Sequence, residues 1–272
     1  FALELFGPII IASVVSTTVA QHLLGSDPVY TIPVEKLLNE YKLVNEAEII
    51  LHLMLGGLIG LASVVFIRIF SGLDVLFRWV LPMERLKPLI AMVAFAGIAI
   101  FFPAVLGNGF DTVNEVLGGK QGTIGFLLSL CLLKVVATAL CRAGGIPGGL
   151  FTPSLFVGAL LGNAFGIAAS DLLPAGSTAQ PGAYALVGMG AILAGTIQAP
   201  ITAILMIFEM TQDYALILPL MSGCIASAVV SHLLQAGSLY TEPLRRRRIH
   251  VPSAVAPTWL HQPPIRSVID PH

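Results

Sequence analysis

A glycine-rich segment at 144–153 is the part of the sequence whose residue types and spacing best suit a chemical task. Four glycines precede an apolar run there, namely Gly144, Gly145, Gly148 and Gly149. Glycine leaves backbone N–H groups open to a ligand, and the first N–H groups of a helix have no partner inside that helix. Because the helix dipole adds a partial positive charge, the segment predicts an anion site built from backbone amides. Such a site binds modestly, which suits permeation because the ion must also leave.

Two other interpretations of these glycines stay open from the residues alone. Small residues let helices cross closely in a membrane, and the glycine content by itself favours this packing role. A phosphate-binding loop is weakly supported, since no Gly-Lys-Ser or Gly-Lys-Thr sequence follows the glycines.

The composition is that of a membrane protein. Of the 272 residues, 56% are hydrophobic and 11% are charged, whereas soluble domains carry roughly 25% charged residues. Uncharged stretches cover 5–26, 49–67, 89–110, 143–170, 172–208 and 214–241, and several of them exceed the roughly 20 residues that span a bilayer. A formal net charge of -1 gives no sign of a nucleic-acid partner. Four arginines at 245–248 follow the last apolar stretch and predict a cytoplasmic C-terminal end.

The pattern predicts an all-α polytopic fold with a transmembrane domain at 1–248 and a cytoplasmic linker at 249–272. Helices are expected at 8–24, 48–78 and 88–102 and in a segment ending near Arg142, and shorter apolar pieces follow at 149–169, 183–195, 199–212, 214–234 and 236–244. Broken helices at membrane depth are tolerated where backbone groups meet protein, water or a ligand, so they indicate a transport pathway. Because the chain opens on Phe1 without an initiator Met, we expect both ends to be cut.

One sequence run resembles a known family. Residues 144–162, GGIPGGLFTPSLFVGALLG, are similar to the signature of the CLC family of chloride channels and chloride–proton antiporters. The resemblance implies that Gly149 and the amides of Leu150 and Phe151 bind the central anion. The supporting motif is then Gly145, Pro147, Gly148, Thr152 and Pro153.

A second run, 238–241, followed by Leu244 and the arginines, resembles the family's final short helix. By this resemblance the Tyr240 hydroxyl touches the same anion. Without the flanking match, a tyrosine anchored at the membrane interface is an equally good interpretation.

A third run, 198–209, is similar to a family helix at the dimer interface, with Glu209 as a structural carboxylate rather than a proton carrier. The resemblance implies an inverted-repeat fold, mainly its second repeat, and a homodimer formed through 8–24 and 199–233. It also implies a bacterial inner membrane, chloride as the transported ligand and no cofactor. A faint echo between 1–5 and 207–210 is typical of such repeats, and 263–269 resembles the lead-in to a CBS regulatory domain.

The mechanism stays open between a passive channel and a proton-coupled antiporter. Leu5 stands where proton-exchanging members carry a second glutamate after the one matching Glu4, and the usual linker before Gly7-Pro8 is missing. A non-transporting structural subunit is a further alternative. An intramembrane hydrolase would need a Ser-His pair, paired aspartates or an HExxH sequence, so we predict no enzyme activity.

The remaining polar residues suggest structural roles. His22, His52 and His232 stand singly on apolar helices and predict hydrogen-bonded side chains rather than a metal site. Lys134 and Arg142 are expected to reach toward the membrane interface, and Arg142 could also attract anions. The three cysteines lie in apolar surroundings without CxxC spacing and predict buried free thiols.

Overall fold

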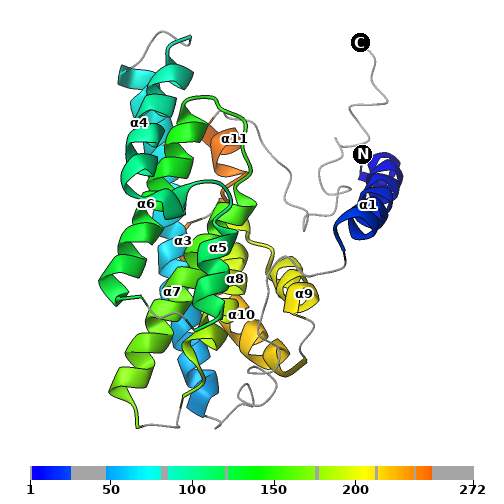
Figure 1. Ribbon diagram of the computed structural model, residues 1–272, viewed down its shortest axis with the longest axis vertical. Helices are drawn as coiled ribbons and strands as arrows, with labels where there is room; N and C mark the ends of the chain where they lie inside the picture. The colour runs from blue at the N-terminus through cyan, green and yellow to red at the C-terminus, as the bar shows by residue number, and fades with distance from the viewer. Residues whose placement is uncertain are drawn as a thin grey trace, which may run out of the picture.

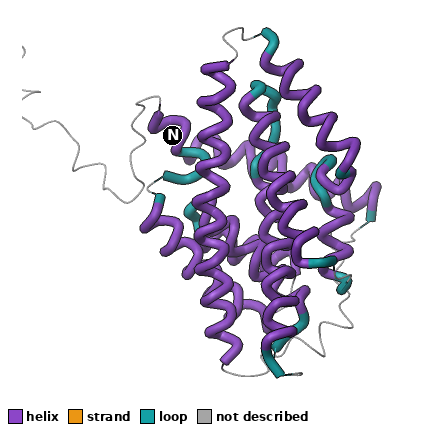
Figure 2. The backbone as a smooth tube through the Cα atoms, turned by 90° about the vertical axis from the view of Figure 1, so that its left-hand side faces the viewer, coloured by secondary structure: helices purple, strands orange, loops and turns teal. Residues whose placement is uncertain are grey.

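The computed structural model describes residues 2–25, 47–80, 85–119, 122–174, 178–211, 214–235 and 237–246. This part of the chain is helical and contains no strand (Figures 1 and 2). The all-α prediction is therefore confirmed. The predicted linker at 249–272, with its resemblance to a CBS lead-in, lies outside the described residues.

Most helices begin and end within three residues of the predicted positions, but α1 begins at Ala2 rather than at residue 8. They are α1 (Ala2–Leu24), α3 (Ala47–Val80), α4 (Lys87–Phe101), η1 (Pro103–Val105), α5 (Phe110–Leu117), α6 (Ile124–Ala143), α7 (Phe151–Leu172), α8 (Pro181–Ile197), α9 (Pro200–Thr211), η2 (Tyr214–Leu216), α10 (Ile217–Leu234) and α11 (Glu242–Arg246). Prolines set several starts, because proline lacks an N–H that the first helical turn does not need. Pro181 and Pro200 accordingly open α8 and α9.

Five of the described helices are long and apolar enough to cross a membrane. The candidate spans are Phe6–Leu23, Glu48–Phe77, Ile124–Ala143, Phe151–Leu172 and Ile217–Leu234. The prediction of a polytopic membrane protein rests on the same property, the length of uncharged helix.

The antiparallel pair α7 and α8 forms the centre of the bundle. Gly158 faces Gly188, Gly162 faces the backbone of Tyr184, and Gly166 faces Pro181, each so closely that a Cβ would meet a neighbouring atom. Every α8 residue from 182 to 196 is buried. The glycines therefore have a packing role along α7, as the alternative interpretation of glycine in membranes predicts.

Helices α3 and α10 close the bundle beside α8 (Figure 1). Gly60 of α3 packs against Ser227 of α10. The Ser227 hydroxyl donates 2.6 Å to the carbonyl of Ala191, and the Ser231 hydroxyl donates 2.7 Å to that of Gly195. These serines tie α10 to α8 by hydrogen bonds in a setting where apolar contact alone gives little driving force between helices.

Helix α1 lies apart from the bundle (Figure 1). It runs without a break through Gly7 and Pro8, so the chain passes from Glu4 to Leu24 as one helix. Its described side chains from Phe6 to Leu23 are exposed, and Ile11 exposes 66% of its surface. An apolar helix with no buried face within the described part of the chain is one that lipid or another polypeptide has to cover.

Candidate functional site

The first residues of the glycine-rich segment form the C-terminal cap of α6. The amide of Gly145 donates 2.9 Å to the carbonyl of Arg142, and the amide of Ile146 donates 3.0 Å to that of Cys141. Gly145 has φ +79°, in the left-handed region that glycine favours. This pair of bonds is a Schellman motif, which turns the chain back toward the bundle. Gly145 therefore positions the segment, and this role needs no contact with a ligand.

Helix α7 starts at Phe151 without a capping side chain. No described residue accepts a hydrogen bond from the amides of Leu150, Phe151 or Thr152. Pro153 has no N–H, and the amide of Ser154 already donates 3.3 Å to the carbonyl of Leu150. The unpaired donors nearest the helix start are therefore the amides of Leu150, Phe151 and Thr152.

The surroundings of this helix start suit an anion. Gly148 and Gly149 are exposed, and a Cβ on either would meet nothing within 4 Å. Leu150 points inward and is buried, and its carbonyl also accepts 2.8 Å from the Ser154 hydroxyl. Carbonyl oxygen is therefore turned away while N–H groups stay free, and the α7 dipole adds partial positive charge. Such a helix terminus can hold an anion by hydrogen bonds alone.

Tyr240 lies in a turn rather than in a helix. The predicted helix at 236–244 is wrong in extent, because α11 begins at Glu242. The turn is closed by the Ser238 amide, which donates 2.8 Å to the Thr241 hydroxyl, and by the Glu242 amide, which donates 2.9 Å to the Ser238 carbonyl. These local bonds compete with helix formation at Ser and Thr. The turn leaves Tyr240 47% exposed, available to a ligand or to solvent.

The packing of α7 on α8 brings the two predicted anion motifs to one end of the bundle. Facing positions run from Gly166–Pro181 to Gly158–Gly188, so the two helices keep an antiparallel register. Two further turns bring Leu150 level with Thr196. The amide of Leu239 donates 2.9 Å to the carbonyl of Thr196, which fixes the Tyr240 turn at that level. In Figure 1, α11 and the connection between α6 and α7 both lie in the upper half of the bundle.

Lys134 is a buried cation, and the prediction that it reaches toward the membrane interface is wrong. It does not reach toward the interface, because it is 2% exposed in the middle of α6. Its ammonium donates 2.8 Å to the carbonyls of both Val105 and Gly107 and lies 5.0 Å from the centroid of the Phe156 ring. A single lysine within an apolar helical run is the sequence signal that could have identified it.

The other polar candidates lie away from this end or are exposed. Glu209 is exposed on α9, and His22 and His232 are exposed at the ends of α1 and α10. His52 is buried, its Nδ1–H donates a 2.7 Å hydrogen bond to the Glu48 carbonyl, and its ring stacks on that of Tyr184 with the centroids 5.0 Å apart.

The histidine and cysteine contacts favour structural roles. Two of the three histidines on the described helices are exposed, so only His52 behaves as the predicted hydrogen-bonded core residue. All three cysteines are free thiols, and Cys141 is partly exposed. Within the described ranges, His, Cys, Asp and Glu side chains form no cluster of three that could hold a metal. The Arg142 guanidinium lies 6.0 Å from the ring of Phe70, beside the end of α6.

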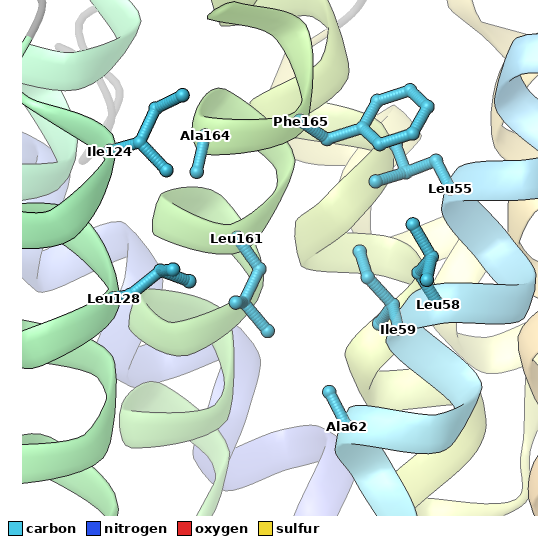
Figure 3. Close-up of a pocket in the computed structure, with 9 residues that line it drawn as sticks. All are labelled: Leu55, Leu58, Ile59, Ala62, Ile124, Leu128, Leu161, Ala164 and Phe165. Atoms are coloured by element: carbon cyan, nitrogen blue, oxygen red, sulfur yellow. The ribbon is translucent and has the colours of Figure 1, made fainter. Parts of the chain in front are cut away.

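A cavity of about 330 Å³ lies between α3, α6 and α7, and Figure 3 shows the side chains that line it. All nine are apolar, with Leu55 and Ile59 on α3 facing Leu161 and Phe165 on α7. An anion stripped of water needs N–H or O–H donors, which these side chains do not offer. The cavity therefore does not belong to the candidate anion site.

The fold and the site together define a class, a polytopic helical membrane protein with an unpaired helix start inside its bundle. The sequence model of the family described as "Voltage gated chloride channel" matches residues 1–232. The chain belongs to this family.

Two relatives show how much of a whole protein the chain represents. It is 41% identical over 235 residues to "Chloride channel protein CLC-f" of Arabidopsis thaliana, which covers 81% of this chain and 29% of that protein. It is 34% identical over 242 residues to "H(+)/Cl(-) exchange transporter ClcA" of Vibrio parahaemolyticus serotype O3:K6, which covers 88% of this chain and 50% of that protein. The chain thus spans half or less of the length of these two relatives.

Solved structures agree with the fold. The crystal structure of a slow cyanobacterial Cl-/H+ antiporter superposes with a TM-score of 0.68 at 27% identity, over 75% of this chain and 48% of that one. A eukaryotic CLC transporter superposes with a TM-score of 0.56 at 24% identity, over 75% of this chain and 36% of that one. The predicted CLC-like fold is confirmed.

Proposed function

We propose that the protein carries chloride or a similar small anion across a membrane, and that the amides of Leu150 and Phe151 together with the Tyr240 hydroxyl hold the ion. The observation that carries the proposal is the start of α7, where these amides have no acceptor among the described residues. Buried or half-buried N–H groups normally find a partner, and an anion supplies one.

The remaining residues of the motif act around this site. Gly145 turns the chain, Gly148 and Gly149 keep the approach open, and Pro153, which lacks an N–H, adds no donor to the site. Pro147 and Thr152 complete the segment that leads into α7. Modest affinity follows from a site without a contacting ammonium or guanidinium, and a transported ion has to leave its site again.

The surroundings proposed for the protein follow from its helices and charges. The apolar faces of 8–24 and 199–233 pack against a second copy, and the rest of the bundle faces lipid. A bacterial inner membrane with a cytoplasmic C-terminus fits the arginines that follow α11. A purely structural subunit would explain the small residues on α7 and α8 but not two separate donor groups brought to one level.

A substitution of the backbone itself tests the site most directly. Replacing the amide of Phe151 by an ester, through a hydroxy acid incorporated in the full-length protein, removes one N–H and leaves every side chain in place. We expect the Kd for chloride to rise by roughly tenfold, as for the loss of one hydrogen bond to a charged group. Isothermal titration calorimetry measures the Kd, and chloride efflux from liposomes measures transport.

The matched control is an ester at Leu218, also in the first turn of a helix, α10. It should leave chloride binding unchanged. Wild-type protein that neither binds nor moves chloride would refute the proposed function. Equal effects of both esters would instead remove the start of α7 from the site. Proton movement recorded in the same liposomes separates a coupled antiporter from a passive channel.

A further inference from the structure

Lys134 carries a charge that the described structure does not neutralise. Among the described residues, the partners of its ammonium are two carbonyl oxygens and the face of an aromatic ring. No carboxylate of the described part forms an ion pair with it. Lys134 is the eleventh of the twenty residues of α6, a candidate membrane span, so the charge lies near the middle of that helix.

Placing an ammonium at that depth costs free energy, so its presence indicates a specific role. Charges inside the hydrocarbon region are rare, and they usually pair with another charge or belong to an ion pathway. The two carbonyls lie at the end of η1 and in the loop before α5, where backbone acceptors need donors at this depth. A neutral side chain with an N–H could donate to a carbonyl as well, so the carbonyls alone do not account for a full positive charge.

Phe156 connects this charge to the candidate anion site. The ring that faces the ammonium belongs to α7, five residues after Phe151. At 1.5 Å per residue, the start of α7 is therefore about 7.5 Å further along the helix axis. Phe156 is fully buried, and a Cβ on Gly109 would overlap its ring. Lys134, the 105–109 segment and α7 thus form one packed unit with little water between its parts.

We propose that the ammonium of Lys134 is the fixed countercharge of the transported anion, and that it raises anion affinity at the start of α7 across the packed interior without touching the ion. The inference rests on the proposed function, and in it Lys134 acts on the proposed anion site from a distance. The α7 dipole and Lys134 both present positive charge near one region, and an anion there is attracted by both.

The size of the effect follows from distance and medium. Opposite unit charges on the order of 10 Å apart, at an effective dielectric constant of about 20, change a dissociation constant by roughly tenfold. The effect depends on charge and hardly on which side chain carries it. A purely structural role, in contrast, depends on donating to the carbonyls of Val105 and Gly107.

Three variants of the full-length protein separate charge from hydrogen bonding. Lys134→Gln keeps an N–H donor without charge, Lys134→Arg keeps the charge, and Lys134→Met keeps neither. We expect the chloride Kd to rise roughly tenfold for Gln and Met and to stay within about threefold of wild type for Arg.

The melting temperature in chloride-free buffer shows which variants are folded. The chloride Kd of a folded neutral variant, Lys134→Gln or Lys134→Met, is then compared with that of wild type. A neutral variant that binds chloride as tightly as wild type would overturn the inference while leaving the proposed function intact. An Arg variant as weak as the Gln variant would also overturn it, because the charge would then not suffice. Wild-type protein without chloride binding would overturn the proposed function and this inference with it.

Discussion

The backbone amide of Leu239 donates a 2.9 Å hydrogen bond to the carbonyl of Thr196, the last buried residue of α8. Leu239 itself is 3% exposed, so the bond is shielded from water. Through it, the turn that carries Tyr240 is fastened at the level where α7 begins. Residues 43 positions apart in the chain are thereby held in one place, and several measurements follow from this arrangement.

Tyr240→Phe should weaken chloride binding in the full-length protein. If the hydroxyl donates to the ion, its loss should raise the Kd roughly fivefold to tenfold, near the lower end for hydrogen bonds to charged groups, because Tyr240 is half exposed and water can substitute. Calorimetry measures the change. Tyr214→Phe, at an exposed tyrosine whose ring meets Phe208, is the control. Unchanged affinity for Tyr240→Phe would remove this residue from the site.

Thr241→Val should act through Tyr240. The change keeps the side-chain shape but removes the hydroxyl that accepts from the Ser238 amide at 2.8 Å, so the turn loosens. We expect a rise in the chloride Kd of about threefold, and less than that when Tyr240 is already Phe. Thr211→Val, whose hydroxyl bonds within α9, should leave binding unchanged. Fully additive effects in the double variant would show that the turn and the tyrosine act separately.

Gly56→Ala and Gly57→Ala should differ sharply although they are neighbours on α3. A Cβ at Gly56 would overlap the carbonyl of Gly223 on α10, whereas one at Gly57 would meet nothing within 4 Å. We expect a loss of about 1–3 kcal/mol in the free energy of unfolding for the first and no loss for the second. Denaturant titration in detergent measures both. Equal stability of the two variants would contradict the close α3–α10 contact.

Single cysteines on α9 and α10 should cross-link two copies in membranes. Leu205 and Ile225 are 60% and 49% exposed and lie in the predicted dimer segment 199–233. In a background without the native cysteines, a bifunctional maleimide should link cysteines at these positions. A cysteine at Val93, 67% exposed on α4 and outside the predicted dimer segments, is the comparison and should stay unlinked. Equal linking at all three positions would argue for random collision rather than a dimer.

Residues 1–272 by themselves should give no chloride flux when reconstituted in liposomes. Gly148 and Gly149 are exposed in the chain as it stands, so one side of the candidate site would face lipid or a neighbouring protein instead of a closed polar pathway. The full-length protein, measured in parallel, should transport. Anion-selective flux from this chain alone would show that 144–240 forms a complete pathway.

Local features predicted the helices well. Gly118, Gly145, Pro181 and Pro200 each stand where a helix starts or ends, because glycine and proline change the backbone at their own position. The start of α7 was predictable for the same reason, and its free amides follow from the absence of a capping side chain. The extent of α11 was not, since the hydroxyls of Ser238 and Thr241 bond to the backbone and hold a turn where the apolar pattern predicted a helix.

By itself the sequence determined the all-α membrane fold, most helix boundaries and the segment with unpaired amides, because these depend on neighbouring residues and on the length of apolar runs. Only the tertiary structure decided what meets those amides. The register of α7 on α8 sets the level of Leu150 against Thr196, and the Lys134 ammonium finds its carbonyls 27 and 29 residues away. The register arises from close glycine packing between α7 and α8 and the Lys134 contacts from the packing of α6 beside 105–107, and no local pattern in the chain encodes either.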